Sequence, residues 1–377
     1  MDFTIQAEQQ ELMDLVRQVV DEEIRPRALA MDQDGEVPDE LWTVLQQTGI
    51  TALAVPEAYG GMGLDHVTLA LLFEELAKGC AGIATACAAN MLALLPVLIG
   101  GSEEQKQAFC HNLLQGGMAA FALTEPGAGS DAAAGTTSAV KTDSGYVLNG
   151  VKHFITNGPL ANQVVVFANA RKERGVRGMT AFIVDASLPG FSVGKVEDKM
   201  GIRASATSEI ILENCEVADS ARIGKEGRGF PLAMATLNAS RPHVGAISVG
   251  IAEEALQRAL TYVHQREQFG SKLIALQMVQ QLIADMAMQV EAARLLVYQA
   301  AAKTDAQEKN AGVYAAMAKC FASDVAMKAT VDAIQVMGGM GYSRESGVEK
   351  LARDAKVMQI FEGSNQVQRG IIANGIK

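Results

Sequence analysis

The sequence predicts an α+β protein of three domains: an N-terminal helical domain at 1–118, a middle β domain at 119–228 and a C-terminal four-helix bundle at 229–377. Three changes in pattern carry this prediction. Apolar residues first recur at helical spacing, and short runs rich in Val, Ile, Phe and Thr then replace them. Helical spacing returns after Gly229. The chain of 377 residues has room for two to three domains of about 150 residues each.

The first helix is predicted by one apolar stripe with a period of 3.6 residues. The stripe consists of Leu12, Leu15, Val16, Val19 and Val20. We expect Arg25 and Pro26 to end this helix, because proline lacks the N–H that a helix interior needs. A Gly-rich turn, AYGGMGLD, then separates further helical stretches.

A later stretch of the first domain raises the question of a membrane. Residues 81–101 carry no formal charge, and their length is close to that of a transmembrane helix. Asn90 and Pro96 interrupt the middle of this apolar run. We therefore predict a buried helix and its connection, with a membrane contact as the alternative.

The middle domain is predicted to be a β domain from its strand-like runs. These runs are AAFALT, GYVLNGVKHFIT, NQVVVFANA, GMTAFIVD and SEIILENCEV, separated by Gly, Asn and Asp. No amphipathic segment of helix length lies between them to make a crossover between parallel strands. The pattern therefore disfavours a Rossmann sheet.

The third domain is predicted to be an antiparallel helical bundle, because long helical patterns follow one another with short connections. Two of its apolar stripes are Leu256, Ala259, Leu260, Val263 and Leu282, Ile283, Met286, Val290. A third helical run, rich in Ala and Met, extends from Ala311 to Met337. Its small residues suit either the internal core or contacts between subunits.

Composition excludes several classes of protein. Lys and Arg number 32 against 43 Asp and Glu, and the net charge of −11 repels phosphate backbones, so no nucleic-acid partner is expected. Five cysteines without a C-x-x-C pair fit reduced thiols, and the N-terminus, MDFTIQAEQQ, carries no export signal. A cytoplasmic location is expected. No metal is predicted, because the five histidines lack ligand spacing.

The first candidate motif is LTEPGAGSD, Leu123 to Asp131, directly after a predicted strand. Gly127 and Gly129 let the backbone approach a planar or anionic group, and Thr124 and Ser130 supply hydroxyls. A Gly-Pro turn without a ligand accounts for the same residues.

The second motif is KHFITNG, Lys152 to Gly158. Phe154 and Thr156 are two residues apart, so on a strand they point to the same face and are able to hold the edge of a flat ring. The alternative is an ordinary half-buried strand.

The third motif is QIFEGSNQVQRG, Gln359 to Gly370. Glu362 lies in an apolar stretch, where a carboxylate is costly unless it is paired or used. An ordinary solvated acid is the alternative. Ser364 or Asn365 is a candidate N-cap for a final helix.

Together these stretches resemble the acyl-CoA dehydrogenase family, in its short- and medium-chain or butyryl-type branch. The resemblance covers essentially the whole chain and includes LTEPGAGSD, KHFITNG, REQFG with Gln277 downstream, QVMGGMGY and RDAKVMQIFEGSNQ, in order. It implies the fold predicted above, an FAD cofactor and an acyl-CoA substrate. It also implies an electron-transferring flavoprotein as redox partner and a homotetramer built as a dimer of dimers.

The resemblance implies roles for individual residues. Those lining the flavin ring and its pyrophosphate side are Phe121, Leu123, Thr124, Gly129 and Ser130, with Phe154 and Thr156 against the ring. Those reaching a neighbouring subunit's FAD are Arg266, Gln268, Phe269, Gln277, Gln335 and Gly339, and Ser364 and Gln366 close the cofactor site. The substrate contacts fall on Ser130, Asn238, Arg241 and Gly363. The catalytic base falls on Glu362.

The sequence departs from the family's common pattern at three of these places. Phe154 replaces a Trp, Phe361 replaces a Tyr before the base, and Asn238 replaces an Asp near CoA. Some branches carry the base just before the residue that corresponds to Arg241. Ser240 occupies that position here and cannot serve as the base, which leaves Glu362.

The chemistry that the resemblance implies is α,β-dehydrogenation of an acyl-CoA thioester, with Glu362 removing the α-proton and the β-hydride passing to flavin N5. The alternatives are an enoyl-CoA reductase running the reverse reaction, and an oxidase or monooxygenase that uses oxygen. A non-catalytic flavoprotein or a nucleic-acid-binding relative is a further one. The acyl group stays open, whether linear, branched, aromatic or alicyclic.

Overall fold

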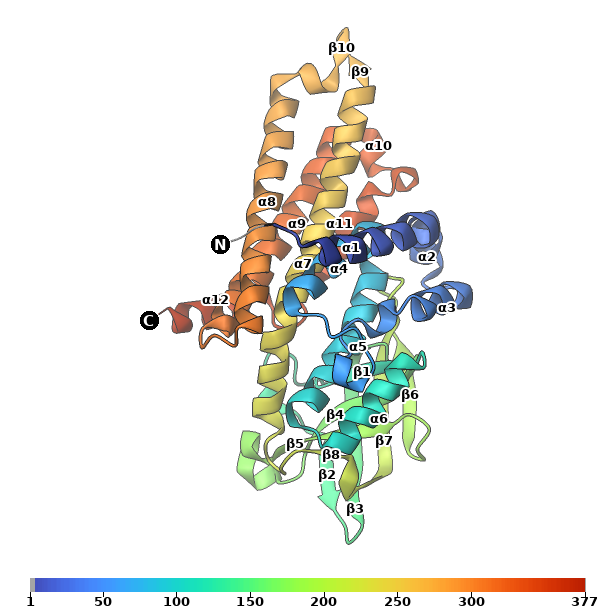
Figure 1. The fold of residues 1–377 in the computed structure, drawn as a ribbon, viewed down its shortest axis with the longest axis vertical. Helices are drawn as coiled ribbons and strands as arrows, with labels where there is room; N and C mark the ends of the chain where they lie inside the picture. Colours follow the sequence, from blue (N-terminus) through green and yellow to red (C-terminus); the bar gives the residue numbers. More distant parts are fainter. Residues whose placement is uncertain (1–3, 377) are drawn as a thin grey trace.

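The computed structural model describes residues 4–376. The two ends of the chain form helices, and the middle of the chain forms a sheet (Figure 1). The long C-terminal helices and the sheet lie at opposite ends of the molecule. The N-terminal helices are α1 (Ala7–Val19), α2 (Ala28–Asp34), α3 (Asp39–Gln47), α4 (His66–Gly79), α5 (Ala81–Gly100) and α6 (Glu103–Leu114).

Helix α1 confirms the predicted stripe except at Leu15. Met13, Val16 and Val19 are buried, whereas Leu15 is 45% exposed, because it lies about 200° around the helix from Met13. The prediction that Arg25 and Pro26 end this helix was wrong in detail. The α-helix ends at Val19, a π turn covers Val20–Ile24, and Pro26 lies in the first turn of a 3-10 helix, where its missing N–H costs nothing.

Helix α5 confirms the predicted buried helix. It is long and apolar enough to cross a membrane, but 78% of its apolar window is buried inside the fold. Asn90, in the middle of this helix, donates to Thr51 O and accepts from the backbone N–H of Ala119 and from Asn157 Nδ2. The amide thus ties α5 to the sheet through bonds that would be unsatisfied in lipid.

The middle of the chain forms one sheet in the order β6-β7-β3-β2-β4-β5-β8, with β1 paired to β4. All five predicted runs are strands. The strands are β1 (Met118–Ala122), β2 (Ser138–Lys141), β3 (Gly145–Thr156), β4 (Ala161–Asn169), β5 (Met179–Asp185), β6 (Phe191–Val196), β7 (Thr207–Ala218) and β8 (Arg222–Ile223). The sequence did not predict β2, β6 and β8, which are short or largely exposed and therefore lack a strong apolar signal.

The pairing within the sheet is mixed. β1 pairs with β4 in parallel, and β3 with β7 and β4 with β5 are antiparallel. Between its strands, the described part of this segment contains 3-10 turns and no α-helix. This agrees with the prediction that no helix connects parallel strands here. The arrangement is not a Rossmann sheet.

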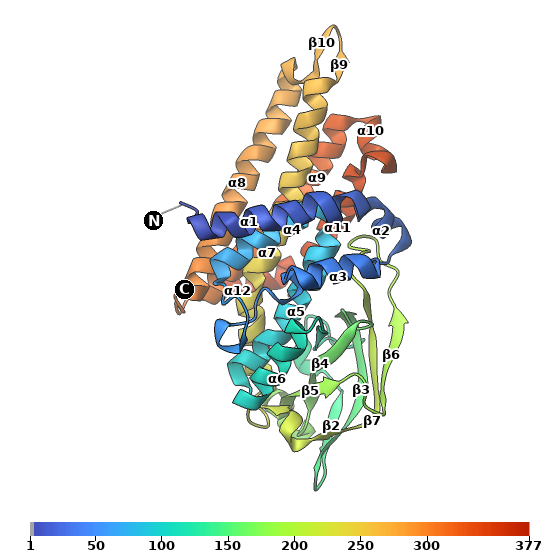
Figure 2. The ribbon, with the colours of Figure 1, turned by 45° about the vertical axis from the view of Figure 1, so that its right-hand side comes forward.

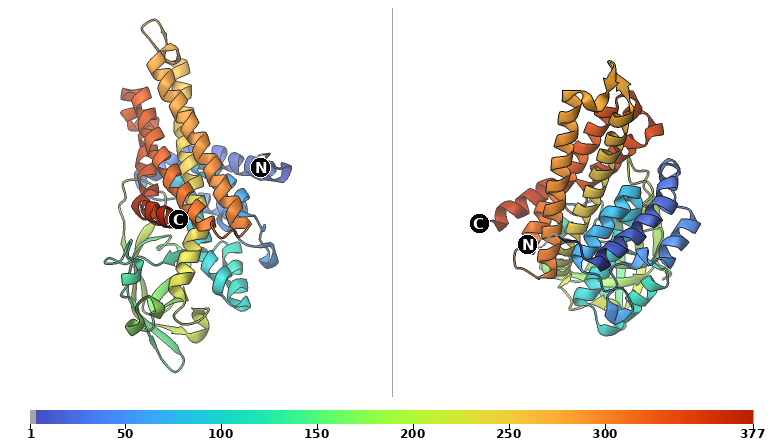
Figure 3. Two further views of the ribbon diagram at one scale, coloured as in Figure 1. Left: turned by 90° about the vertical axis from the view of Figure 1, so that its left-hand side faces the viewer. Right: turned by 45° about the horizontal axis from the view of Figure 1, so that its top comes forward.

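The C-terminal part forms the predicted bundle. Its helices are α7 (Gly229–Gln265), α8 (Gln277–Asp305), α9 (Ala311–Met337) and α11 (Val348–Met358), with the short α10 (Gly339–Tyr342) and the final α12 (Asn365–Gly375). A small hairpin of β9 (Glu267–Gln268) and β10 (Ser271–Lys272) joins α7 to α8 at the tip farthest from the sheet (Figures 1 and 3). We propose domains at 1–118, 119–228 and 229–377. Their boundaries lie close to the start of β1 at Met118 and at the start of α7 at Gly229.

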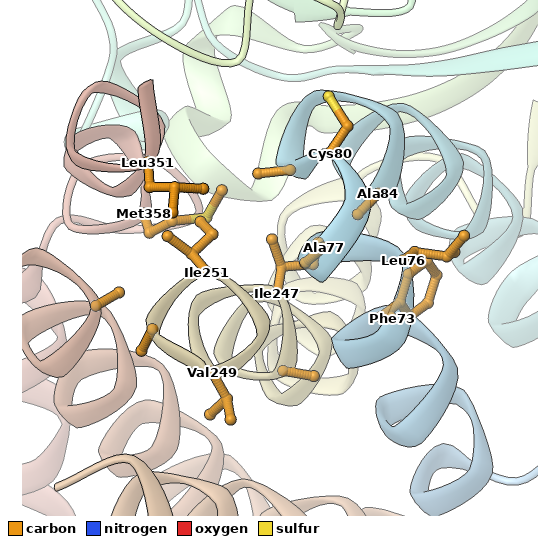
Figure 4. Packing of buried hydrophobic residues seen from close by; sticks show 14 of the residues in the cluster. Phe73, Leu76, Ala77, Cys80, Ala84, Ile247, Val249, Ile251, Leu351 and Met358 are labelled. Atoms are coloured by element: carbon orange, nitrogen blue, oxygen red, sulfur yellow. The ribbon is translucent and has the colours of Figure 1, made fainter. Parts of the chain in front are cut away.

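One core joins the N-terminal helices to the bundle. Figure 4 shows Phe73 and Leu76 of α4 packed toward Ile247 of α7, with Met358 of α11 on the other side of α7. Most alanines of α9 are buried within this single chain, among them Ala315, Ala316, Ala318 and Ala322. Their small side chains therefore serve the internal core, where α9 packs closely against α7.

Candidate active site

A buried ion pair joins the first two sequence motifs. Lys152 on β3 donates to Glu125, in the loop after β1, at 2.8 Å and to Leu123 O at 3.2 Å. Glu125 also accepts from the backbone N–H groups of Thr136 and Thr137 at 2.6 and 3.0 Å. Burial alone would raise the pKa of Glu125, but Lys152 and the threonine donors lower it to about 2. The ionised carboxylate therefore fixes the Gly-rich loop to the sheet.

The Gly-rich loop leaves space beside its glycines. A Cβ atom added at Gly127 or Gly129 would meet nothing within 4 Å. Ser130 is exposed and Thr124 partly exposed, so both hydroxyls are available to a ligand. Phe121 and Leu123 lie deeper: Phe121 packs on Phe167 with ring centroids 4.9 Å apart, and Leu123 is buried in the core. These two residues support the loop from beneath.

Strand β3 presents an aromatic ring outside the core. Its register with β7 shifts between Lys152 and Ile155, and Phe154 has a φ of 55° at this irregularity. The Phe154 side chain is 58% exposed and stacks on His153 with ring centroids 4.0 Å apart. Strict alternation is lost at this irregularity, because Lys152 is buried while Phe154, two residues on, is exposed; Ile155 is buried and Thr156 is partly exposed. Phe154 thus offers an exposed apolar face of the kind a flat ring stacks on.

The loop between α11 and α12 holds Glu362 in an unusual backbone conformation. Glu362 has a φ of 51° and Gly363 a φ of 92°, and a non-glycine residue adopts this left-handed region at a cost in strain. The Glu362 carbonyl accepts from Gln368 Nε2 at 3.0 Å and from Arg241 Nε at 3.3 Å. Lys319 Nζ donates to the Gly363 carbonyl at 2.9 Å. These donors fix the strained turn in one shape.

Glu362 is partly buried, and its carboxylate has one close hydrogen-bond partner. Its Oε2 accepts a hydrogen bond from Ser240 Oγ on α7 at 2.5 Å. Burial raises the pKa of Glu362, while the Ser240 hydroxyl, the Arg241 guanidinium and the Lys319 ammonium oppose that rise. Glu362 is therefore a partly buried acid with a raised pKa and not a solvated one.

Arg241 and Asn238 form a second contact on α7. Arg241 is buried, and its Nη1 donates to Asn238 Oδ1 at 2.5 Å. Burial lowers the pKa of Arg241, and the charge of Glu362 opposes this effect. The exposed Asn238 side chain thus orients an arginine that also holds the Glu362 loop.

The remaining predicted cofactor residues lie elsewhere in the fold. Gln277, Gln335 and Gly339 are exposed, as are Arg266, Gln268 and Phe269, whose side chain is 92% exposed. They belong to the hairpin end of the bundle, at the opposite end of the molecule from the sheet that carries Phe154 (Figures 1 and 2). A single chain therefore does not bring these two sets of residues together. Of the two residues predicted to close the cofactor site, Ser364 is partly buried and Gln366 is exposed.

Sequence reasoning missed several residues that build the Glu362 site. Lys319 and Asn365 are buried and bonded to each other at 3.0 Å, and Gln368 is also buried. Asn365 also donates to Asp324 on α9 at 2.8 Å. The predicted N-cap is confirmed at Ser364, whose hydroxyl accepts from the backbone N–H of Val367 at the start of α12. Lys319 lies within the alanine-rich run at 311–337. A lysine in such an apolar run could have indicated a buried polar partner, because a buried cation is costly without one.

A buried histidine next to this site predicts acid sensitivity. His243 lies one turn after Ser240 on α7, with its Nε2 3.3 Å from His66 Nδ1. Burial and the His66 charge lower the pKa of His243 to about 3. The unfolded state takes up a proton below about pH 6.5 that the folded state refuses, so stability falls as pH decreases from 6.5 toward 3, by up to about 1.4 kcal/mol per pH unit.

His243→Val is therefore expected to flatten this decline. The measurement is the free energy of urea unfolding between pH 4 and 6.5 in wild type and variant. His111→Val, at a residue that is not packed in this core, is the control and should keep the wild-type slope. Parallel curves for wild type and His243→Val would contradict the assignment.

Comparison with known proteins identifies the class. Three family models match in chain order: the acyl-CoA dehydrogenase N-terminal domain at 6–117, the middle domain at 120–215 and the C-terminal domain at 227–377. Butyryl-CoA dehydrogenase from Megasphaera elsdenii superposes with a TM-score of 0.97 at 43% identity, covering 100% of both chains. Cyclohex-1-ene-1-carbonyl-CoA dehydrogenase from Geobacter metallireducens is 43% identical, covering 98% of both chains.

A chain solved in work on the electron transferring flavoprotein of Acidaminococcus fermentans also has a TM-score of 0.97 at 43% identity, covering 100% of this chain and 99% of its own. The more distant PigA, at 31% identity and a TM-score of 0.93, was solved as an FAD complex. The matched family models and the FAD-bound relatives show that the chain is a flavin-dependent oxidoreductase. The chain belongs to the acyl-CoA dehydrogenase family.

Proposed function

We propose that this enzyme removes two hydrogens from the α and β carbons of an acyl-CoA thioester, giving the 2-enoyl-CoA, and passes the electrons to an electron-transferring flavoprotein. One observation carries the proposal. Glu362 is partly buried, has a raised pKa, and is held by Ser240 through its carboxylate and by Gln368 and Arg241 through its carbonyl. A strained, well-anchored acid of this kind is typical of a catalytic base.

The raised pKa suits the chemistry. A carboxylate with the usual pKa of about 4.3 is a weak base for the α-proton of a thioester, and burial brings its proton affinity closer to what the step needs. FAD, when bound, supplies the acceptor for the hydride that leaves the β-carbon. The thioester oxygen gains negative charge as the α-proton leaves and needs a hydrogen-bond donor. The Glu362 N–H, which meets no backbone acceptor among residues 4–376, is available for that bond.

The residues of the Gly-rich loop and β3 fit a flavin. Phe154 offers an exposed aromatic face, and Thr124, Thr156 and Ser130 offer accessible hydroxyls. The open space at Gly129 lets the backbone approach a pyrophosphate. Ser364 and Gln366 would close the cofactor site from the Glu362 loop. The tip residues of the bundle would complete a neighbouring subunit's site, which supports a homotetramer built as a dimer of dimers.

The substrate would lie between the Gly-rich loop and the Glu362 loop. Ser130 and Gly363 would contact the thioester part, and Asn238, with Arg241 behind it, would contact CoA. The Megasphaera elsdenii relative acts on butyryl-CoA and the Geobacter metallireducens relative on an alicyclic acyl-CoA. The Acidaminococcus fermentans structure comes from work on an electron transferring flavoprotein. These relatives support the substrate class and the redox partner that we propose.

The proposal is tested with a panel of saturated acyl-CoAs added to the purified yellow enzyme without oxygen. We expect one acyl class to bleach the oxidised flavin band in a single turnover and an electron-transferring flavoprotein to restore it. Rates in both directions, with each redox partner, show whether the enzyme works as a dehydrogenase or as an enoyl-CoA reductase. Fast oxygen consumption would favour an oxidase, and a colourless protein that refuses FAD would contradict the whole assignment.

A further inference from the structure

We propose that Ser240 is a positioning residue for the base: its hydroxyl donates to Glu362 while the carboxylate is charged, and turns to the Leu237 carbonyl when Glu362 holds the proton. This inference rests on the proposed role of Glu362 as the base. In the sequence, Ser240 is notable only because a serine at this position cannot serve as the base; the structure gives it a separate role.

The geometry gives the Ser240 hydroxyl two acceptors. Ser240 is 1% exposed, so no bulk water competes for its hydrogen. Its Oγ lies 2.5 Å from Glu362 Oε2 and 3.2 Å from Leu237 O, one turn back on α7. A serine hydroxyl carries one hydrogen and two acceptor lone pairs, so it donates to only one of these oxygens at a time.

Both protonation states of Glu362 then have complete hydrogen bonds. In the charged state the hydroxyl donates to the carboxylate, and a hydrogen bond to the charged form favours that form. When the Cα–H bond of the substrate breaks, the proton forms an O–H bond on Glu362 and the electron pair stays with the substrate. The new O–H then donates to Ser240 Oγ, and the serine hydrogen turns to Leu237 O. Ser240 keeps its own proton throughout.

Other groups near Glu362 do not replace this hydroxyl. The charged groups that act on the carboxylate are Arg241 on α7 and Lys319 on α9. Arg241 donates to the Glu362 carbonyl and Lys319 to the Gly363 carbonyl. Among the described residues, Ser240 is the hydrogen-bond donor found on the carboxylate itself. The charges of Arg241 and Lys319 therefore act on Glu362 in both protonation states. Ser240 supplies the hydrogen bond that changes when Glu362 gains or loses its proton.

The test compares Ser240→Ala with Ser240→Thr, which restores a hydroxyl. Ser248→Ala is the matched control, because Ser248 is also a buried serine of α7, bonded to Val244 O at 2.8 Å and remote from the carboxylate. Infrared difference spectra titrate the carboxylic acid band of Glu362 in the FAD-loaded enzyme without substrate. The band is identified by its absence in Glu362→Gln. Stopped-flow flavin reduction by the active acyl-CoA gives the rate against pH.

Ser240→Ala is expected to raise the apparent pKa of Glu362 by about one to two pH units in both measurements, since it removes one hydrogen bond to a charged group. Flavin reduction should then be about 10- to 100-fold slower at a pH below both titrations and within a few-fold of wild type on the high-pH plateau. Ser240→Thr and Ser248→Ala should both titrate like wild type.

Two results would overturn the inference: an unmoved titration in Ser240→Ala, or a rate that falls equally at all pH values, which would indicate a packing role only. Failure of the proposed function has a different signature. In that case wild-type flavin is not reduced by any acyl-CoA, while the infrared titration still reports on Ser240 and Glu362.

Discussion

Glu362→Gln is expected to slow flavin reduction by the acyl-CoA substrate by about 10²- to 10⁴-fold, the usual contribution of a positioned general base. Gln has nearly the same shape, and its side-chain carbonyl still accepts from Ser240, so the loop between α11 and α12 should keep its form. It has no proton affinity near neutral pH, so the α-proton has no acceptor. FAD content and the dissociation constant for the acyl-CoA should change little.

The measurement is single-turnover flavin bleaching at saturating acyl-CoA, with FAD content read from the absorption spectrum. Glu40→Gln, at an exposed acid in the first turn of α3, is the control and should react like wild type. A Glu362→Gln enzyme that bleaches within a few-fold of wild type would remove this residue from the mechanism. Loss of FAD from the variant would instead point to a structural role for the carboxylate.

Lys152→Met is expected to destabilise the protein by about 3–5 kcal/mol and to lower its FAD content. The change leaves Glu125 buried without its cation, although the carboxylate keeps the Thr136 and Thr137 donors. Glu125 must then take up a proton or draw in water, and either change loosens the Gly-rich loop from β3. That loop carries Thr124, Gly129 and Ser130, so we expect cofactor binding to weaken along with stability.

The stability is measured as the denaturant midpoint of the FAD-free protein, and the affinity by titration with FAD. The double change Lys152→Met with Glu125→Gln should recover part of the lost stability, because no unpaired charge remains and the amide oxygen still accepts from the threonines. Lys195→Met removes a surface partner of Glu197, and its denaturant midpoint should stay close to that of wild type, because solvent screens an exposed ion pair. A Lys152→Met protein as stable as wild type would show that the pair does not hold the loop.

Much of the fold could be predicted because apolar spacing records which face of each element is buried. The five strand runs of the middle domain fall on strands to within two residues, and the run at 311–337 coincides with α9. The short, exposed β6 lacks such a pattern, and Leu15 shows that an apolar residue at helical spacing is not always buried. The π turn at Val20–Ile24 was equally hidden, since Val19 and Val20 continue the same apolar helical spacing through the point where the α-helix ends.

The candidate site was predictable residue by residue but not as an arrangement. Glu362 was a candidate because a carboxylate in an apolar stretch is costly unless it is paired or used, and in the structure it is partly buried with a raised pKa. Ser240 is far from it in sequence, and only the packing of the Glu362 loop against α7 brings the two side chains together. A single chain keeps the bundle-tip residues and the Gly-rich loop at opposite ends of the molecule (Figure 1), so a shared role for them in cofactor binding stays a proposal.

The sequence alone predicts the order of helical, β and helical parts, the family, and the acid on which the proposed chemistry depends, because period, composition and motif are local properties of the chain. How that acid is held follows from the tertiary fold. Burial raises the pKa of Glu362. This rise is opposed by Ser240 and Arg241 on α7 and by Lys319 on α9. Proton affinity depends on the charges and donors within a few ångströms, and those neighbours are chosen by folding rather than by sequence proximity.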